Sequence, residues 1–341
     1  MASSIVESAR GPERGTRFAA WRWVFAIGLA AVLLYKALHG VDWMRVWRTV
    51  LAARWEYLAG ASLVSVSSYV LRALRWRILL NAGASAPLRV STVFRANMAG
   101  YLGNNVLPAR AGEVIRSLII SSQSSLSRAY VLTTAVSERM MDAIVLVLWG
   151  SLTLAQVTSK PPWMEAVART MALVAGTAAL ALMVLPHAEG LVQRLVRRLP
   201  VPPALKERMK LMVEQILLAI RAFHHVGRFV KFAALTAAIW AADATSMMIA
   251  ARGLGLEMRF AAAVLLLTAL GLGSALPSTP GYVGIYQFAA VTVLAAFGVT
   301  RDQALAYSLV TQALGYAVIA ILGVPGLYGA LVRRKVRSIN S

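Results

Sequence analysis

The chain has 341 residues, of which 59% are hydrophobic and only 14% are charged, and its mean hydropathy is +0.66. Soluble domains have about 45–50% apolar and about 25% charged residues, so this composition indicates an integral membrane protein. The formal net charge of +21 is concentrated in the two termini and a middle linker. Basic segments that flank membrane spans mark the cytoplasmic side and attract anionic lipid, so no nucleic-acid partner is expected.

The first membrane half is predicted over residues 18–186, after a basic cytoplasmic tail at residues 1–17. Its apolar runs are long enough to cross a membrane, and they lie near residues 18–38, 55–74, 127–157 and 164–185. The second of these runs ends in a basic and aromatic group: Arg72, Arg75, Trp76 and Arg77. Residues of these types gather where a span meets the cytoplasmic interface, so this group is expected there.

A break in the helical pattern is predicted within residues 90–122, because glycine and proline interrupt an apolar run there. Seven residues carry the polar or helix-breaking character of this stretch: Asn104, Asn105, Pro108, Arg110, Gly112, Glu113 and Arg116. In hydrocarbon, unpaired backbone groups and charges must face protein or water. We therefore expect a membrane-dipping hairpin that builds a polar site, the alternative being a water-facing loop between two ordinary helices.

The long predicted helix at residues 127–157 carries Glu138, Arg139 and Asp142 in its inner part. Glu138 and Asp142 are four residues apart and therefore share one helix face. Charges in an apolar helix are not expected to face lipid. They indicate either a functional site or a structural ion-pair network, and sequence alone does not separate the two.

The second membrane half is predicted over residues 232–335, between a basic amphipathic linker at 187–231 and a short tail at 336–341. A second hairpin is predicted at residues 260–297. Five of its residues are expected to line the outer half of a path or, alternatively, to form a kinked packing corner: Pro277, Ser278, Pro280, Gly281 and Gln287.

The two hairpins share a pattern, since Leu107 to Val114 and Leu276 to Val283 both read Leu-Pro-x-x-x-Gly-x-Val. Broken apolar segments at corresponding places in two halves point to a transporter-type site between inverted repeats. The predicted fold is an all-α polytopic membrane protein with about six full spans and two opposed re-entrant hairpins. Basic ends place both termini in the cytoplasm.

The polar residues of the first half can recognise a phosphate. Three arginines can hold its oxygens through bidentate forks: Arg110, Arg116 and Arg139. Asn104 and Asn105 add neutral donors. The carboxylates Glu113, Glu138 and Asp142 can pair with these arginines or bind a coupling proton. We find no catalytic motif and no metal-ligand spacing among the four histidines, so no catalytic residue, metal or cofactor is expected.

Four segments resemble one known family. They are Arg75-Trp-Arg77, Asn104-Asn-Val-Leu-Pro-Ala-Arg-Ala-Gly-Glu113 with Arg116, Glu138-Arg-Met-Met-Asp142 and Pro277-Ser-Thr-Pro-Gly-Tyr-Val-Gly284. The chain resembles the lysylphosphatidylglycerol synthase transmembrane-region, or flippase-like, family from about residue 18 to 335. The resemblance implies a bacterial or archaeal inner-membrane protein connected with cell-envelope lipids. It does not imply synthase activity, because the aminoacyl-transferase domain of the synthases is not present in this sequence.

The resemblance leaves the lipid unnamed, because the family is functionally diverse, and many relatives have a glutamate near the position of Gln287. The expected function is translocation or binding of an anionic phospholipid or polyprenyl-linked lipid in the bacterial inner membrane. Two alternatives stay open, a lipid-modifying transferase and a non-transporting scaffold for an envelope-lipid biosynthetic enzyme.

Overall fold

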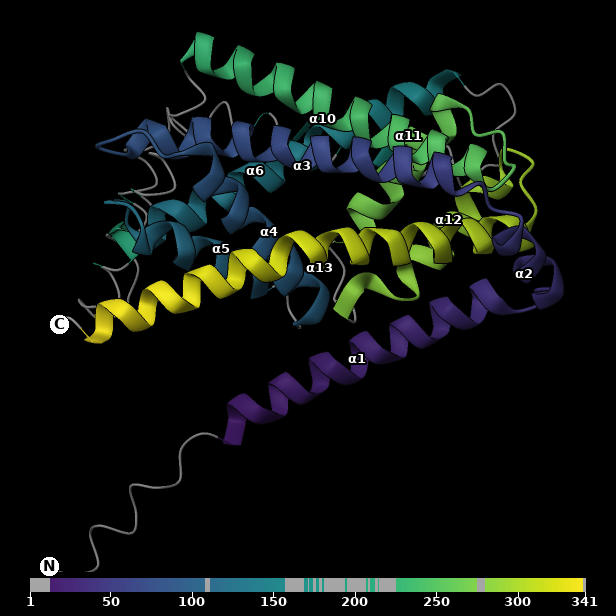
Figure 1. Ribbon diagram of the computed structural model, residues 1–341, viewed down its shortest axis with the longest axis horizontal. Coiled ribbons are helices and arrows are strands. Elements are labelled where there is room, and N and C mark those ends of the chain that lie inside the picture. Colours follow the sequence, from purple (N-terminus) through teal and green to yellow (C-terminus); the bar gives the residue numbers. More distant parts are fainter. Residues whose placement is uncertain are drawn as a thin grey trace, which may run out of the picture.

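In the computed structural model, every regular element of the described residues is a helix (Figure 1). The structure describes residues 13–107, 111–156, 225–274 and 280–339, with isolated positions between 169 and 214. The predicted span at 164–185 and most of the predicted linker at 187–231 therefore fall outside the described residues. The prediction of an all-α fold is confirmed for the described part of the chain.

The first half contains α1 (Glu13–Leu38), α2 (Trp43–Leu51), α3 (Trp55–Gly83), α4 (Val90–Val106), α5 (Ala111–Ser122) and α6 (Arg128–Gln156). The second half contains α10 (Val226–Gly253), α11 (Phe260–Gly273), the short 3-10 helix η3 (Pro280–Tyr282), α12 (Ile285–Ala295) and α13 (Arg301–Ile339). By length and composition, α3, α10 and α13 can each cross a membrane. The α1–α2 pair, bent by 84°, makes a fourth if it counts as one span.

The long helices approach one another closely at small residues. The two halves meet where α3 packs along α10, and the Ser246 hydroxyl donates to the Ala61 carbonyl across this contact at 2.8 Å. Gly323 and Gly326 of α13 lie against the α4 backbone at Met98 and Arg95. Small residues at these crossings let backbones come together, as is typical of helix packing in membranes.

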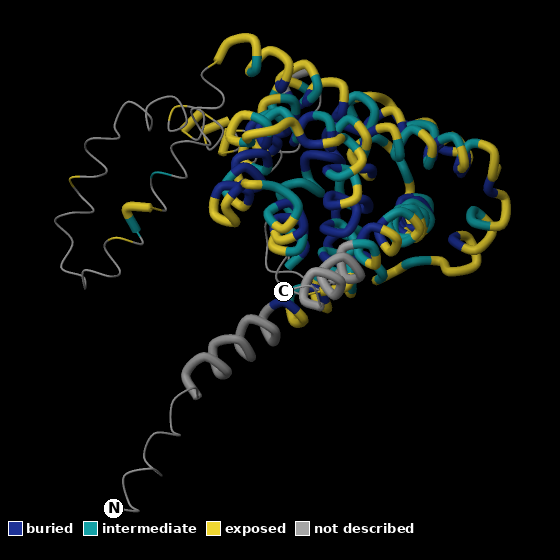
Figure 2. The backbone as a smooth tube through the Cα atoms, turned by 60° about the vertical axis from the view of Figure 1, so that its left-hand side comes forward, coloured by how far each residue is buried: buried dark blue, intermediate teal, exposed yellow. Residues whose placement is uncertain are grey.

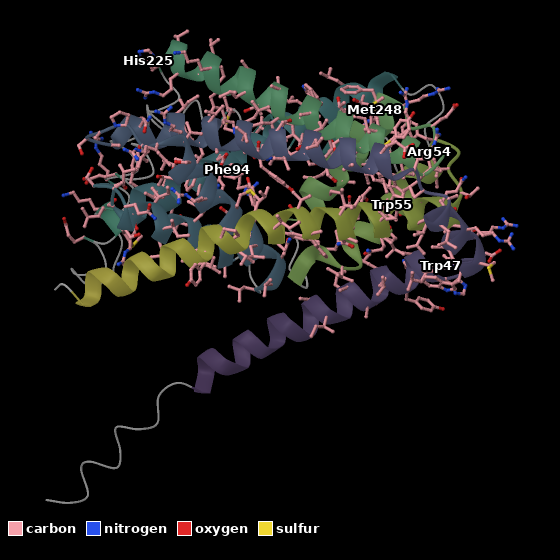
Figure 3. The ribbon with its side chains drawn as sticks, viewed as in Figure 1. Trp47, Arg54, Trp55, Phe94, His225 and Met248 are labelled. Atoms are coloured by element: carbon pink, nitrogen blue, oxygen red, sulfur yellow. The ribbon has the colours of Figure 1, made fainter. Side chains whose placement is uncertain are left out.

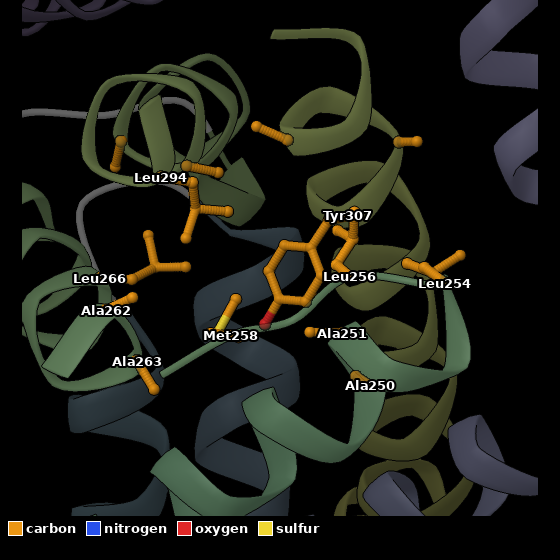
Figure 4. Packing of buried hydrophobic residues seen from close by; sticks show 14 of the residues in the cluster. Ala250, Ala251, Leu254, Leu256, Met258, Ala262, Ala263, Leu266, Leu294 and Tyr307 are labelled. Atoms are coloured by element: carbon orange, nitrogen blue, oxygen red, sulfur yellow. The ribbon is translucent and has the colours of Figure 1, made fainter. Parts of the chain in front are cut away.

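A large apolar core fills the end of the molecule where α10, α11, α12 and α13 meet (Figure 4). Tyr307 of α13 is fully buried in it, with its ring among Leu256, Met258 and Ala251. Its hydroxyl donates to the Met247 carbonyl at 3.4 Å. Figure 2 shows the buried segments inside the bundle and exposed segments along its outside. This core fixes the start of α13 against the end of α10.

Exposed aromatic residues mark one end of the molecule. Trp47 and Trp55 are 59% and 63% exposed, and they lie with Arg54 near the turn from α1 into α3, whereas His225 lies at the opposite end (Figure 3). Large apolar side chains such as Leu63 and Ile321 are also exposed, each at 71%, on helices long enough to span. Tryptophan is enriched at membrane interfaces, so this pattern agrees with a bundle whose outer surface faces lipid.

Candidate functional site

The centre of the bundle holds a cluster of ionised side chains around Arg75 of α3. Its Nη1 and Nη2 donate to the two oxygens of Asp142 at 2.5 and 2.9 Å. Its Nη2 and Nε donate to Oε1 of Glu138 at 2.8 and 3.3 Å, and Nη1 also donates to the Thr236 hydroxyl at 3.1 Å. Arg75 has no exposed surface, so it joins α3, α6 and α10 inside the protein.

The α4–α5 hairpin adds a second part to this cluster. Arg116 of α5 donates to Oε2 of Glu138 at 3.0 Å and lies 2.6 Å from Glu113. Glu113 also accepts from Nε of Arg139 at 3.1 Å, and Arg139 lies 3.9 Å from Asp142. Because Asp142 and Glu138 both bind Arg75 as well, these ion pairs form a closed ring in which arginines and carboxylates alternate.

One further pair extends the ring toward α10. Nη2 of Arg72 lies 2.5 Å from Oδ2 of Asp243, and its Nη1 lies 3.9 Å from Asp142. Among the described residues, the charge network therefore has four arginines and four carboxylates: Arg72, Arg75, Arg116, Arg139, Glu113, Glu138, Asp142 and Asp243. With equal numbers of each sign, buried charges can be tolerated away from water.

Every arginine of the charge network also lies over an aromatic ring, at 4.4 to 5.7 Å from the ring centre. The pairs are Arg72 with Trp240, Arg75 with Phe232, Arg116 with Trp76 and Arg139 with Tyr101. The negative face of an aromatic ring attracts a cation, most strongly where water is excluded. The stacking holds each planar guanidinium in the orientation that its carboxylates require.

The close approach of α4 and α5 places Glu113 and Arg116 in the network. The backbone N–H of Gly112 donates to Oδ1 of Asn104 at 3.0 Å, which satisfies a group that the first turn of α5 would otherwise leave unpaired. Gly100 and Gly112 face each other so closely that a Cβ at either position would meet the opposite helix. Asn97 of α4 then accepts from Arg116 at 3.0 Å.

A cavity of about 890 Å³ opens beside the charge network. Its charged wall is formed by Arg72, Arg139, Glu113, Asp142 and Asp243, with Asn104 and Asn105 beside them. A second wall, formed by η3, α12 and α13, is uncharged and carries hydroxyl and amide groups: Tyr282, Tyr286, Thr311, Gln312 and Tyr316. The cavity therefore pairs an ionised half with a neutral, hydroxyl-rich half.

The neutral wall is ordered by an amide network at the start of α12. Gln287 accepts from the backbone N–H of Gly284 at 2.8 Å and donates to Gln312 at 2.6 Å. Gln312 donates to the Gly281 carbonyl at 2.8 Å, and the Tyr316 hydroxyl donates to the same carbonyl. Gly281 and Gly284 have φ values of 72° and 88°, a conformation that favours glycine.

The predicted site residues fall into three groups. Asn104, Asn105, Glu113, Arg139, Asp142 and Gly281 line the cavity. Arg116, Glu138, Gly112 and Gln287 lie behind its surface in the networks described above. Pro108, Arg110, Pro277 and Ser278 lie outside the described residues, as does the side chain of Pro280.

Sequence reasoning missed Arg72 and Arg75 as members of this site. They were expected at the cytoplasmic end of a span, whereas the structure packs their side chains into the protein interior, where Arg72 is 8% exposed and Arg75 is fully buried. Asp243 is a signal that could have revealed their position, because a lone carboxylate in an apolar run requires a cationic partner inside the bundle.

The model of the lysylphosphatidylglycerol synthase TM region matches residues 23–323. The chain belongs to this family. It is also similar to a UPF0104 membrane protein of Methanothermobacter thermautotrophicus, with 23% identity over 312 residues that cover 86% of this chain and 89% of the relative. No solved structure matches the chain. Family membership and the apolar spanning helices together make this a helical multi-pass membrane protein.

Proposed function

We propose that this member of the family binds an anionic lipid within the membrane and moves it between the two leaflets. The observation that carries this proposal is the cavity of about 890 Å³ with Arg72 and Arg139 in its wall. Ligand cavities typically measure about 300–1,000 Å³, and intramembrane charges mark substrate pathways by default. In this proposal the protein is a transporter and performs no chemistry on the lipid.

Arg139 and Arg72 are the arginines best placed to receive the phosphate. Arg139 has a 32% exposed side chain and, among the described residues, donates one hydrogen bond, to Glu113 at 3.1 Å. Arg72 likewise donates one, to Asp243. A guanidinium carries five N–H donors, so both retain donors for phosphate oxygens. Arg116 is 1% exposed, and we assign it to holding Glu113 and Glu138 in place.

The uncharged wall suits the remaining part of the headgroup. Six of the ten tyrosines of the chain line this cavity. Tyrosine offers an apolar face together with a hydroxyl that can donate or accept. A glycerol or sugar beyond the phosphate would therefore find partners at Tyr286, Gln312 and Tyr316. This arrangement supports an anionic phospholipid or a lipid-linked sugar as substrate.

We further propose six spans and two opposed re-entrant hairpins in inverted halves. The packing of the described helices supports this. The helices α3, α4, α5 and α6 correspond in order to α10, α11, α12 and α13, and for most pairs of helices in contact the corresponding pair is also in contact. Thus α4 packs on α13 as α11 packs on α6. The six spans would be the α1–α2 pair, α3, α6, residues 164–185, α10 and α13. The α6 helix can cross because its charged side chains form ion pairs with charged side chains of neighbouring helices.

The proposed orientation follows from the ends of the helices. The start of α1 and the end of α13 lie toward the same end of the molecule (Figure 1). The α4–α5 hairpin opens toward that end, and the α11–α12 hairpin opens toward the other. Basic segments gather on the cytoplasmic side, so we place both termini in the cytoplasm of a bacterial cell and the bundle in its inner membrane. An envelope-lipid biosynthetic enzyme is a proposed partner.

Native mass spectrometry of the protein in mild detergent, with its co-purified lipids, tests the phosphate assignment. We expect a defined anionic lipid on the wild type that is lost in Arg139→Gln. Arg95→Gln is the matched control, because Arg95 is an exposed arginine of α4 whose hydrogen bond within the described part of the chain goes to Ser91 of its own helix. Equal lipid on all three proteins, or none on the wild type, would overturn the assignment.

A further inference from the structure

We infer that Asp243 is a proton-binding site and that the cavity takes up one proton together with each anionic headgroup. This inference rests on the proposed function and adds an energy source to it. The four arginines and four carboxylates of the charge network already balance one another. An arriving phosphate therefore brings a negative charge that no described group of the network is left to neutralise.

The cost of an unbalanced charge drives this coupling. Arg75, Arg116 and Glu138 are at most 1% exposed, so the environment behind the cavity wall excludes water. An uncompensated charge in such a place is strongly unfavourable, whereas a carboxylate that accepts a proton removes one negative charge at once. Arg110 lies outside the described residues and does not enter this count.

Among the four carboxylates, Asp243 is the one held by the fewest cations. Glu113 and Glu138 each contact two arginines at 3.1 Å or less. Asp142 contacts Arg75 at 2.5 Å and two other arginines at 3.9 Å. Within the described part of the chain, Asp243 forms an ion pair with Arg72 alone, at 2.5 Å.

Arg72 links the proton site to the phosphate site. It is also one of the two arginines proposed to receive the phosphate. When a phosphate draws the guanidinium away, Asp243 loses its cation and shares the region with the carboxylate of Asp142. A proton that enters from bulk solvent as hydronium then forms an O–H bond with Asp243 and leaves a neutral water molecule behind. The neutral acid can donate this hydrogen to a phosphate oxygen.

The surroundings of Asp243 allow a proton to reach it. Its side chain is 19% exposed and belongs to the cavity wall. Of the charged and titratable groups that line the cavity, Arg72 of α3 pairs with Asp243, Tyr69 of α3 interacts with it electrostatically, and Asp142 of α6 lies 3.9 Å from the other side of Arg72. Trp240 of α10 completes this environment by stacking on Arg72 at 5.0 Å.

Proton uptake makes lipid affinity depend on pH. A complex that binds about one more proton than the empty protein gains roughly tenfold in affinity for each unit fall in pH, over the range in which lipid binding takes up that proton. By reciprocity, a proton gradient would then drive the lipid in the direction in which protons flow.

Calorimetric titration with dioctanoyl phosphatidylglycerol in two buffers of different ionisation enthalpy tests the inference. The wild type should take up about one proton per bound lipid. Asp243→Asn should bind without proton uptake and with pH-independent affinity. Glu257→Gln should behave as the wild type, because Glu257 is an exposed carboxylate between α10 and α11.

The outcomes separate this inference from the proposed function. Binding by the wild type without proton uptake, or with uptake of sodium in its place, would overturn the inference and leave the lipid site intact. Undiminished proton uptake by Asp243→Asn would overturn the assignment to Asp243. If phosphatidylglycerol, phosphatidic acid and a polyprenyl phosphate all failed to bind to the wild type, the proposed function would fall together with the inference.

Discussion

Arg75 and Asp142 form a bidentate ion pair in which two guanidinium nitrogens meet two carboxylate oxygens at 2.5 and 2.9 Å. Together with its bonds to Glu138 and Thr236, Arg75 makes five hydrogen bonds. Five is the number of N–H donors in a guanidinium, so the side chain is fully satisfied. It joins α3 and α6 of the first half to α10 of the second, in the buried interior of the bundle.

Arg75→Ala should therefore be strongly destabilising. The substitution leaves Glu138 and Asp142 with fewer cations in a buried place, and breaking a buried pair in this way costs about 3–5 kcal/mol. Arg75→Lys keeps the charge but lacks the fork, so it should fall between alanine and the wild type. Thermal unfolding in detergent measures both, with Arg95→Ala as the exposed control. Unchanged midpoints for the two Arg75 variants would show that the network does not support the fold.

Gly112→Ala tests the close approach of α4 and α5. A Cβ on Gly112 would lie 2.6 Å from Oδ1 of Asn104 and would also meet the Gly100 carbonyl. Overpacking of this kind costs about 1–3 kcal/mol, and it should displace Glu113 and Arg116 from the network. We expect a lower unfolding temperature and weaker lipid binding.

Gly329→Ala provides the comparison, because a Cβ at Gly329 has no neighbour within 4 Å among the described residues. Alanine has a higher helix propensity than glycine, so this variant should be as stable as the wild type or slightly more stable. If Gly112→Ala were equally well tolerated, α4 and α5 would have to be packed less closely than they are in the structure.

The positions of the helices could be predicted from the sequence, because glycine, proline and apolar run lengths act locally. The break predicted within residues 90–122 lies between α4, which ends at Val106, and α5, which begins at Ala111. The prediction that Glu138 and Asp142 share one helix face is confirmed, since both bond to Arg75.

The partners of these carboxylates could not be predicted in the same way. Arg72 and Arg75 stand at the end of an apolar run, where the usual rule for basic residues places them at an interface. Their carboxylates come from α6 and α10, and Asp243 is 171 residues from Arg72 in the sequence. Only the packing of α3 along α10 and α6 shows that these charges meet inside the bundle.

Gln287→Leu tests the amide network of the uncharged wall. The substitution leaves the Gly284 N–H and the Gln312 carbonyl oxygen without their partner, and unsatisfied buried groups cost about 1–3 kcal/mol each. Gln287→Glu keeps the acceptor for Gly284 but, when ionised, sets an unpaired buried charge against the Gln312 oxygen, which costs more than a lost hydrogen bond, so its loss should be larger. The unfolding midpoints of the two variants check this order, and the reverse order would contradict the assigned hydrogen bonds.

A double-mutant cycle on Arg72 and Asp243 tests whether these two residues act as a pair. Arg72→Gln alone leaves Asp243 without an ion-pair partner, and Asp243→Asn alone leaves Arg72 with only the distant contact to Asp142. Each single variant should be destabilised, because each unbalances the charge network by one unit. The double variant restores the balance and should be more stable than the sum of the two changes predicts, with a coupling energy of about 1–3 kcal/mol.

The same cycle separates stability from binding. Because Arg72 is one of the two proposed phosphate ligands, the double variant should regain stability without regaining affinity for dioctanoyl phosphatidylglycerol. A second cycle on the exposed pair Arg45 and Asp42, 3.2 Å apart at the start of α2, is the control and should give a coupling of at most about 1 kcal/mol. Equal coupling in the two cycles would show that burial adds nothing to the Arg72–Asp243 pair. Full recovery of lipid affinity in the double variant would remove Arg72 from the phosphate site.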